Sequence, residues 1–154
     1  MRALGLDIGS VRIGVAVSDP DGRIASPVAV LDARDMPRAM RVLREYVEDY
    51  EIERLVVGLP LTLGGEEGPQ AVEVRTTGEL LSRELDVPLE YHDERHSSTE
   101  ARRSMREAGL SEREQRGSLD KVAAAIVLQG WLDARRVAAL GGMDDRREPN
   151  ITSG

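Results

Sequence analysis

An acidic residue near the N-terminus, Asp7, constrains the fold of this chain more than any other feature. It follows an apolar stretch from Ala3 to Leu6, and a second apolar stretch runs from Ile13 to Val17. Gly9 lies between the two stretches, which predicts a tight turn joining two strands of a hairpin. Burying a carboxylate costs several kcal/mol unless it is paired or bound to a metal ion. Asp7 is therefore a candidate functional residue held near the centre of a sheet.

Composition limits the class of protein. A chain of 154 residues is expected to form one domain with its own apolar core. It has no cysteine, which excludes disulfides and thiolate metal ligands. No segment has the roughly 20 apolar residues of a membrane helix, and no signal-peptide pattern is present, so we expect a cytoplasmic protein. The net charge of −7 argues against unspecific binding to nucleic acid.

Apolar periodicity predicts an α/β domain with the element order β-β-β-α-β-α-β-α-α. The expected strands cover residues 3–6, 13–18, 23–31, 55–60 and 87–91, and the expected helices cover residues 36–50, 70–85, 97–108 and 119–140. This order predicts a mixed five-stranded sheet, a three-strand antiparallel meander plus two parallel strands, with helices on both faces. Residues 62–69 are expected to form a mobile loop. We expect one domain over residues 1–140 and a flexible tail over residues 141–154.

Three acidic positions lie at the ends of predicted elements. Asp7 is in the first strand, Asp93 and Glu94 follow the last strand, and Asp120 opens the last helix. Such ends converge at one edge of an α/β sheet. Because strand side chains alternate between faces, we expect Glu94, and not Asp93, to face the site. A helix cap for Asp120 and a surface turn for Asp93-Glu94 are the structural alternatives.

The chemistry of these residues favours a hard cation. Carboxylates without cysteine are ligands for Mg²⁺ or Mn²⁺ rather than for zinc. A pair of such ions catalyses in-line displacement at phosphorus by activating water and stabilising the leaving oxygen. In a chain with 28 acidic residues, three acids alone carry little weight.

Four segments resemble, in the same order, the YqgF family, also called RuvX, a family of pre-16S rRNA nucleases related to Holliday junction resolvases. They are DIGSVRIGVAVSD, VVGLPLTLGGEEGPQA, DERHSSTEA and LDKVAAAIVLQGWLD. The resemblance implies an RNase H-like fold, which agrees with the predicted element order. It also implies that Asp7, Glu94 and Asp120 are catalytic and hold two Mg²⁺ or Mn²⁺ ions for phosphodiester hydrolysis. The implied role is to process the 5′ end of precursor 16S rRNA in ribosome maturation.

The sequence departs from related junction resolvases at the fourth strand. Those proteins place an acid at the end of that strand, where this chain has Val57-Gly58-Leu59-Pro60 and no carboxylate. We expect Glu94, at the end of the neighbouring strand, to take its place.

Basic residues beside the acids are the candidate nucleic-acid contacts. Arg12 and Arg95 are suited to bidentate phosphate binding, although structural ion pairing is an equal alternative, and Lys121 follows Asp120. The aromatic content of 3% favours recognition of backbone and shape over base stacking. The expected partner is structured RNA such as precursor 16S rRNA, or branched DNA. No membrane partner is expected, and the protein is expected to be a monomer or a homodimer.

Other functions are compatible with these residues. Within the nuclease class, the alternative is a resolvase that cleaves Holliday junctions or other branched DNA. A non-catalytic RNA-binding factor of ribosome maturation would use the fold only for binding, but carboxylates that repel phosphate argue against it. An actin-like ATPase module also begins with a strand carrying Asp-x-Gly, but such proteins enclose the nucleotide between two domains.

Overall fold

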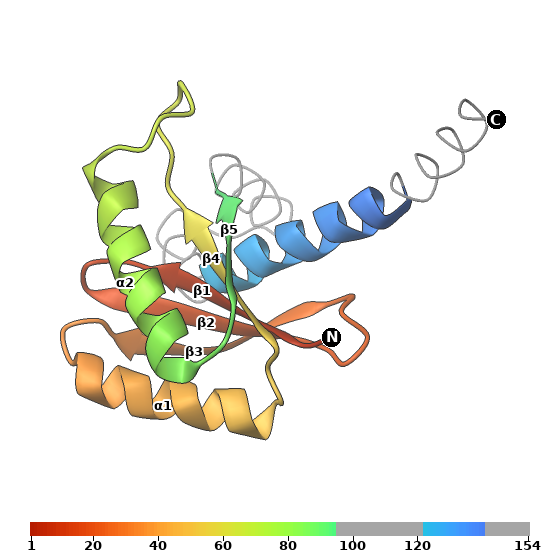
Figure 1. Ribbon diagram of the computed structural model, residues 1–154, viewed down its shortest axis with the longest axis horizontal. Helices are drawn as coiled ribbons and strands as arrows, with labels where there is room; N and C mark the ends of the chain where they lie inside the picture. Colours follow the sequence, from red (N-terminus) through yellow and green to blue (C-terminus); the bar gives the residue numbers. More distant parts are fainter. Residues whose placement is uncertain (95–121, 141–154) are drawn as a thin grey trace, which may run out of the picture.

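The computed structural model describes residues 1–94 and 122–140, which form a sheet with helices on both faces (Figure 1). The strands are β1 (Ala3–Ile8), β2 (Arg12–Ser18), β3 (Ala25–Asp32), β4 (Arg54–Leu59) and β5 (Leu89–Asp93). The helices are α1 (Met36–Asp49), α2 (Pro69–Leu85) and a helix over residues 122–140. The predicted helix over residues 97–108, the start of the last predicted helix and the predicted tail lie outside the described residues.

The five strands have the order β3-β2-β1-β4-β5. β1 pairs with β2, and β2 with β3, in antiparallel fashion, whereas β1 with β4 and β4 with β5 are parallel. This confirms the predicted meander followed by two parallel strands. Asp7 lies in β1, at the centre of the sheet. None of the described helices is both long enough and apolar enough to cross a membrane.

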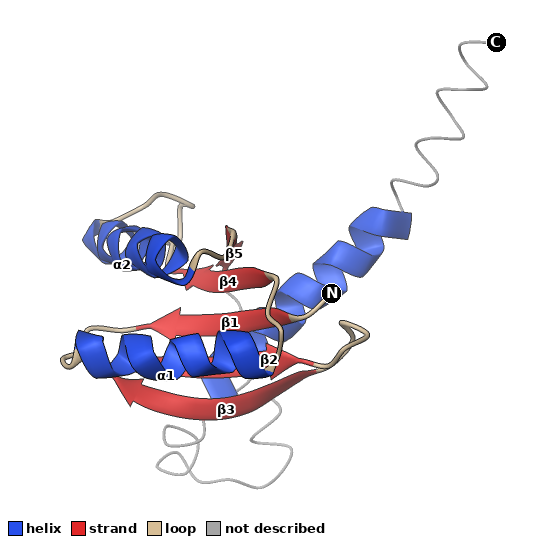
Figure 2. Cartoon of the chain, turned by 60° about the horizontal axis from the view of Figure 1, so that its bottom comes forward, coloured by secondary structure: helices blue, strands red, loops and turns tan. Residues whose placement is uncertain are grey.

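Side chains of β1 alternate between two apolar clusters. Leu4, Leu6 and Ile8 belong to the larger cluster, beneath α1 and α2. Ala3 belongs to a smaller cluster, formed with the helix over residues 122–140. Figure 2 shows α1 in front of the sheet and this last helix behind it. By the same alternation, Asp7 faces the side of the sheet that the last helix covers.

The last helix lies close to the sheet because a glycine of β1 faces it. A Cβ built on Gly5 would be 2.7 Å from Leu128 Cβ and 3.0 Å from the Ala124 carbonyl oxygen. Ala124 and Leu128 are fully buried. The run of small residues Ala123-Ala124-Ala125 therefore lets the helix approach the sheet, with Ala124 at the point of closest approach.

Gly5→Val is expected to lower the free energy of unfolding by about 2–3 kcal/mol, because the added methyl groups must push the helix away from the sheet. Urea unfolding followed by circular dichroism measures this change. Gly64→Ala is the matched control, since a Cβ there would meet only Thr62 Oγ1, at 3.9 Å. An unfolding midpoint that Gly5→Val leaves unchanged would contradict the close packing.

The last helix runs alongside β1 in the opposite direction. Leu132 lies near Gly22, which is next to the start of β1, with Leu132 Cδ2 4.0 Å from a Cβ built on that glycine. Ala124 lies farther along β1, over Gly5. The N-terminal end of the described helix therefore points toward the end of β1 that carries Asp7.

Aromatic side chains belong to the packing between helices and sheet. Tyr46 of α1 and Tyr50, the residue that caps its C-terminus, pack against the larger cluster. Trp131 is 7% exposed in the smaller one. These three aromatic side chains are therefore packing residues.

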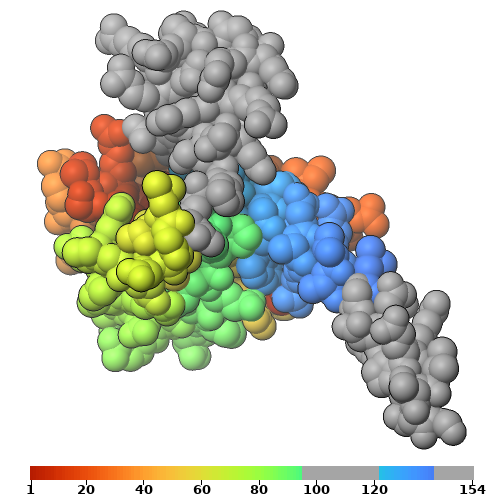
Figure 3. All heavy atoms as spheres, turned by 90° about the horizontal axis from the view of Figure 1, so that it is seen from above, coloured from red at the N-terminus to blue at the C-terminus, as the bar shows by residue number. Residues whose placement is uncertain are grey.

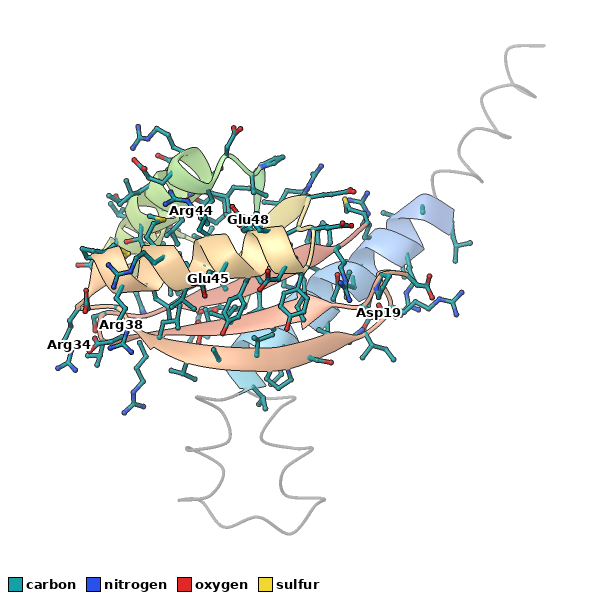
Figure 4. The ribbon with its side chains drawn as sticks, turned by 90° about the horizontal axis from the view of Figure 1, so that it is seen from below. Asp19, Arg34, Arg38, Arg44, Glu45 and Glu48 are labelled. Atoms are coloured by element: carbon teal, nitrogen blue, oxygen red, sulfur yellow. The ribbon has the colours of Figure 1, made fainter. Side chains whose placement is uncertain are left out.

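The outer side of α1 is charged, and one of its arginines links the two helices on this face. Figure 4 shows Arg44 on the side of α1 that faces α2, with Glu45 and Glu48 on the same helix. Arg44 Nη2 donates a hydrogen bond to the Glu84 carbonyl of α2 at 3.2 Å. The two helices are thereby held side by side over the larger cluster.

The loop between β4 and α2, for which the sequence predicts a mobile segment over residues 62–69, contains a defined turn. Leu61 and Glu67 form a β-bridge across its base. The Thr62 amide donates to the Glu66 carbonyl and the Gly65 amide donates to the Thr62 carbonyl, both at 2.8 Å. Gly65 has a φ of 84°, a left-handed conformation that glycine adopts without strain.

Candidate active site

Asp7 and Glu94 come from opposite sides of β4 to the same face of the sheet. Asp7 lies near the end of β1, opposite Gly14 of β2. Glu94 directly follows β5, and its amide donates to the Leu59 carbonyl of β4 at 3.3 Å, which extends the pairing of the two strands by one residue. The carboxyl ends of three adjacent strands thus meet at this place.

Gly58 of β4 makes room for the side chain of Glu94. A Cβ built on Gly58 would collide with Glu94 Oε2 and would lie 2.9 Å from Val127 Cγ2 of the last helix. The Glu94 carboxylate therefore fills the space that a side chain at position 58 would need. The carboxylate missing from the end of the fourth strand is replaced, in space, by one from the neighbouring strand.

Asp93 and Glu94 lie on opposite faces of the sheet, as the preceding residues of β5 show. Tyr91 packs against the larger cluster beneath α2, and Asp93, two residues later, is exposed on that side. His92 contacts the last helix instead, with its Nε2 2.7 Å from a Cβ built on Gly130. In the space-filling view, the end of β5 (green) lies against this helix (blue; Figure 3). Glu94 is on the His92 side, which is also the side of Asp7.

The pKa of Glu94 is raised by burial and by neighbouring negative charges. Its pKa is raised to about 7, first because the carboxylate is buried and then because the negative charges of Asp7 and Asp93 are near. Like charges that are held together in a partly buried position favour the binding of a cation between them. Both oxygen ligands are hard, so the pair suits Mg²⁺ or Mn²⁺.

An open hollow of about 400 Å³ lies beside Asp7. It is formed by the β1–β2 turn and the start of β2, and is lined by Asp7, Gly9, Ser10, Val11, Arg12 and Gly14. The Gly9 amide donates to the Arg12 carbonyl at 2.8 Å, which closes the turn. Arg12 is exposed at the rim of this hollow. Asp7 and the guanidinium of Arg12 thus border the same hollow.

The other predicted site residues, Asp120, Arg95 and Lys121, lie outside the described residues. Within residues 1–94 and 122–140, no group of three or more histidine or acidic side chains is arranged to hold a metal ion. The described part of the site therefore contributes two of the predicted carboxylates, Asp7 and Glu94, and one of the predicted basic residues, Arg12.

Sequence reasoning did not single out Gly14, which lines the hollow, or the part that Gly58 plays as a platform for Glu94. Both are paired residues of the sheet, Gly14 with Asp7 and Gly58 with His92. The strand register identifies them, because it shows which residues lie beside each acid on the same face of the sheet. A glycine in such a position leaves open space next to the carboxylate.

The sheet order and the helices on both faces define an RNase H-like fold, and solved structures agree. RuvC of Thermus thermophilus in complex with a Holliday junction substrate matches with a TM-score of 0.56 and 18% identity, covering 88% of this chain and 96% of that one. Another structure of RuvC from the same organism matches with a TM-score of 0.54 and 19% identity over the same shares.

Sequence comparison gives the family. The RuvX family model, described as Holliday junction resolvase, matches residues 1–134. A relative from Anaeromyxobacter sp. (strain K) is 49% identical over 135 residues, 88% of this chain and 98% of the relative. One from Chloroflexus aurantiacus (strain ATCC 29366 / DSM 635 / J-10-fl) is 45% identical over 133 residues, 86% of this chain and 87% of the relative. Both carry the name "Putative pre-16S rRNA nuclease". The chain belongs to the RuvX family, whose enzyme class is nuclease.

Proposed function

We propose that this protein hydrolyses phosphodiester bonds of nucleic acid with divalent metal ions held by Asp7, Glu94 and Asp120. The observation that supports this most directly is the meeting of Asp7 and Glu94 on one face, where the charge of Asp7 helps to raise the pKa of Glu94. When bound, a pair of Mg²⁺ or Mn²⁺ ions supplies activation of water and stabilisation of the leaving oxygen. The protein supplies the fixed carboxylates and the open path from the hollow.

Spacing in the sequence supports Asp120 as the third ligand. It precedes Ala124 by four residues and Val127 by seven, which are the spacings of about one and two helical turns. Ala124 lies over Gly5 and Val127 over Gly58. A helix continued by one turn would carry a residue at position 120 toward the end of β1.

Three basic residues are proposed to hold the phosphates of the substrate. Arg12 stands at the rim of the hollow beside Asp7, and Arg95 and Lys121 directly follow Glu94 and Asp120 in the sequence. A guanidinium binds two phosphate oxygens at once. Because the net charge of the chain is −7, attraction of the substrate has to be local to such residues.

The proposed substrate is structured RNA, precursor 16S rRNA, which the names of the relatives indicate. We propose its 5′ end as the place of processing. A protein with this substrate would work in the cytoplasm, where ribosomes are assembled. Four-way DNA junctions are the second candidate, because the matching family model is described as a Holliday junction resolvase.

A cleavage assay with both substrates tests the proposal. Purified protein is incubated with labelled precursor 16S rRNA and with a synthetic four-way junction, in Mg²⁺, in Mn²⁺ and in EDTA. We expect RNA cleavage with either metal and none in EDTA. Cleavage of the junction alone would select the second candidate, and cleavage in EDTA would refute the role of the metal. If neither substrate is cut in any metal, the proposed hydrolysis is wrong.

A further inference from the structure

A leucine at the tip of the loop between β4 and α2 is almost completely exposed. Leu63 is 99% exposed, whereas the other exposed large hydrophobic side chains among the described residues lie between 38% and 69%. Figure 1 shows this loop projecting beyond the end of β4, away from both apolar clusters. Leu63 therefore contributes nothing to the described core.

The turn that presents Leu63 is held at its base. Beyond the Leu61–Glu67 bridge, the Glu66 amide donates to Thr62 Oγ1 at 3.1 Å. The next two residues after Leu63 are Gly64 and Gly65, which have no side chains to cover it. A defined turn thus exposes a single aliphatic side chain.

Contacts connect the base of this loop to the strand that leads to Glu94. Arg75 of α2 forms an ion pair with Glu67, and its Nη2 donates to Glu67 Oε2 at 3.1 Å. The Arg75 guanidinium lies 4.5 Å from the centroid of the Tyr91 ring, in a cation–π contact. Tyr91 is in β5, three residues before Glu94. Arg75 therefore links the base of the loop to β5, the strand that Glu94 follows.

The charge of the loop indicates what its tip can contact in a nucleic acid. No basic residue lies between Thr62 and Glu67, and Glu66 repels phosphate. A backbone contact at the tip is therefore unfavourable. Apolar side chains that nucleic-acid-binding proteins insert between base steps unstack the bases and kink the helix. An exposed leucine on a loop tip without basic residues fits that role.

We propose that Leu63 inserts between neighbouring bases of the substrate bound at Asp7 and Glu94. The inference rests on the proposed function, because the loop leaves β4 immediately after Leu59, next to the Gly58 that carries Glu94. Insertion separates two stacked bases close to the phosphodiester that reaches the carboxylates. Leu63 is a positioning residue: it shapes the substrate and takes no part in the chemical step.

Base separation can be measured without cleavage. Four-way DNA junctions and RNA hairpins with 2-aminopurine at successive positions are bound to the full-length protein in EDTA or Ca²⁺, and fluorescence reports unstacking. We expect a rise at one or two adjacent positions. Leu63→Ser should reduce that rise at least fivefold and weaken binding about tenfold, the order expected when one aliphatic side chain is no longer buried. Leu63→Phe should preserve the rise.

Ile24→Ser is the matched control. Ile24 is also aliphatic and 62% exposed, but it lies in the turn between β2 and β3, at the opposite end of the sheet. We expect it to behave as the unsubstituted protein. Because Leu63 and Ile24 are both exposed, neither serine variant should impair folding, which circular dichroism checks.

The outcomes separate this inference from the proposed hydrolysis. Three results would overturn base insertion and leave the proposed hydrolysis untouched. The fluorescence rise could persist in Leu63→Ser, it could also be lost in Ile24→Ser, or the nucleic acid could bind without any rise. A rise that depends on Leu63 in a protein that cuts neither substrate would support insertion and remove the proposed function. Failure of the protein to bind either nucleic acid would overturn both.

Discussion

Asp7→Asn is expected to reduce hydrolysis more than about 100-fold while the protein remains folded, because substitutions of residues that merely orient metal ligands already cost about 10- to 100-fold. Asparagine keeps the size of the side chain but removes the charge that a metal ion requires. Asp7 is half-buried, at the edge of an open hollow, so the change leaves no cavity in the core. Stability should be equal or slightly higher, since the repulsion of Glu94 is reduced.

Cleavage rates in Mg²⁺, together with thermal unfolding by circular dichroism, measure both effects. Asp19→Asn is the control of the same chemistry. Asp19 Oδ1 accepts hydrogen bonds from the Arg23 amide at 2.7 Å and the Ile24 amide at 3.1 Å, in the turn between β2 and β3. Figure 4 shows Asp19 at that turn. The turn joins the end of β2 to the start of β3, at the end of the sheet opposite Asp7. Full activity of Asp7→Asn would remove the catalytic role.

Glu94→Gln is expected to abolish hydrolysis to a similar degree and yet to stabilise the metal-free protein at high pH. The pKa of Glu94 is about 7 in the folded protein and 4.5 without these surroundings, so the folded state holds a proton between these values. The stability that this proton provides is fully present below pH 4.5 and is lost as the pH rises through 7. Glutamine cannot lose a proton, so the variant avoids this loss.

Thermal unfolding at two pH values measures the effect on stability. In EDTA at pH 8, we expect Glu94→Gln to melt about 4 °C higher than the unsubstituted protein, and at pH 4 to melt at the same temperature. Adding Mg²⁺ at pH 8 should raise the melting temperature of the unsubstituted protein but not of the variant, because ligand binding stabilises only the form that binds. A lower melting temperature for the variant at pH 8 would contradict the cost of burying a charged Glu94 beside Asp7.

Asp93→Asn tests which of the two adjacent acids is the ligand. It lies on the other face of β5, and its charge is the smallest of the three causes that raise the pKa of Glu94. We expect its effect on hydrolysis to be at most a few-fold. A larger loss for Asp93→Asn than for Glu94→Gln would reverse the assignment.

The meander and the buried fourth strand were predictable because their apolar runs are local and long. The last strand was not placed as well: the pattern predicts residues 87–91, and the structure has Leu89–Asp93. The Val87 amide donates instead to the Ser82 carbonyl at the end of α2, and Pro88 has no amide to donate. The strand continues through His92 and Asp93 because β4 offers them partners, which no local pattern reveals.

The sequence pattern also misplaces the start of the third strand. The pattern predicts a start at Arg23, but the amides of Arg23 and Ile24 donate to the side chain of Asp19. The strand begins at Ala25, whose amide donates to Gln129 Oε1 of the last helix at 2.9 Å. A local contact with Asp19 and a contact with Gln129, far along the chain, together set this boundary.

Only part of the candidate site could be predicted. The alternation of strand side chains was enough to favour Glu94 over Asp93 as the acid that faces Asp7. The raised pKa of Glu94 could not be predicted, because it depends on burial between Gly58 and Val127, residues from different elements. The order of the loop that carries Leu63 depends on the pairing of Glu67 with Arg75, which composition does not show.

The Glu94 carboxylate lies over Gly58, in the space that a side chain at position 58 would need. A side chain from β4 or one from the end of β5 can fill this space, but not both. An acid introduced at position 58 would evict the carboxylate already present, so the protein cannot gain a further charge there by one substitution. Moving the acid from β5 to β4 in this protein would therefore require two linked substitutions, one that adds the charge at position 58 and one that removes the bulk at position 94.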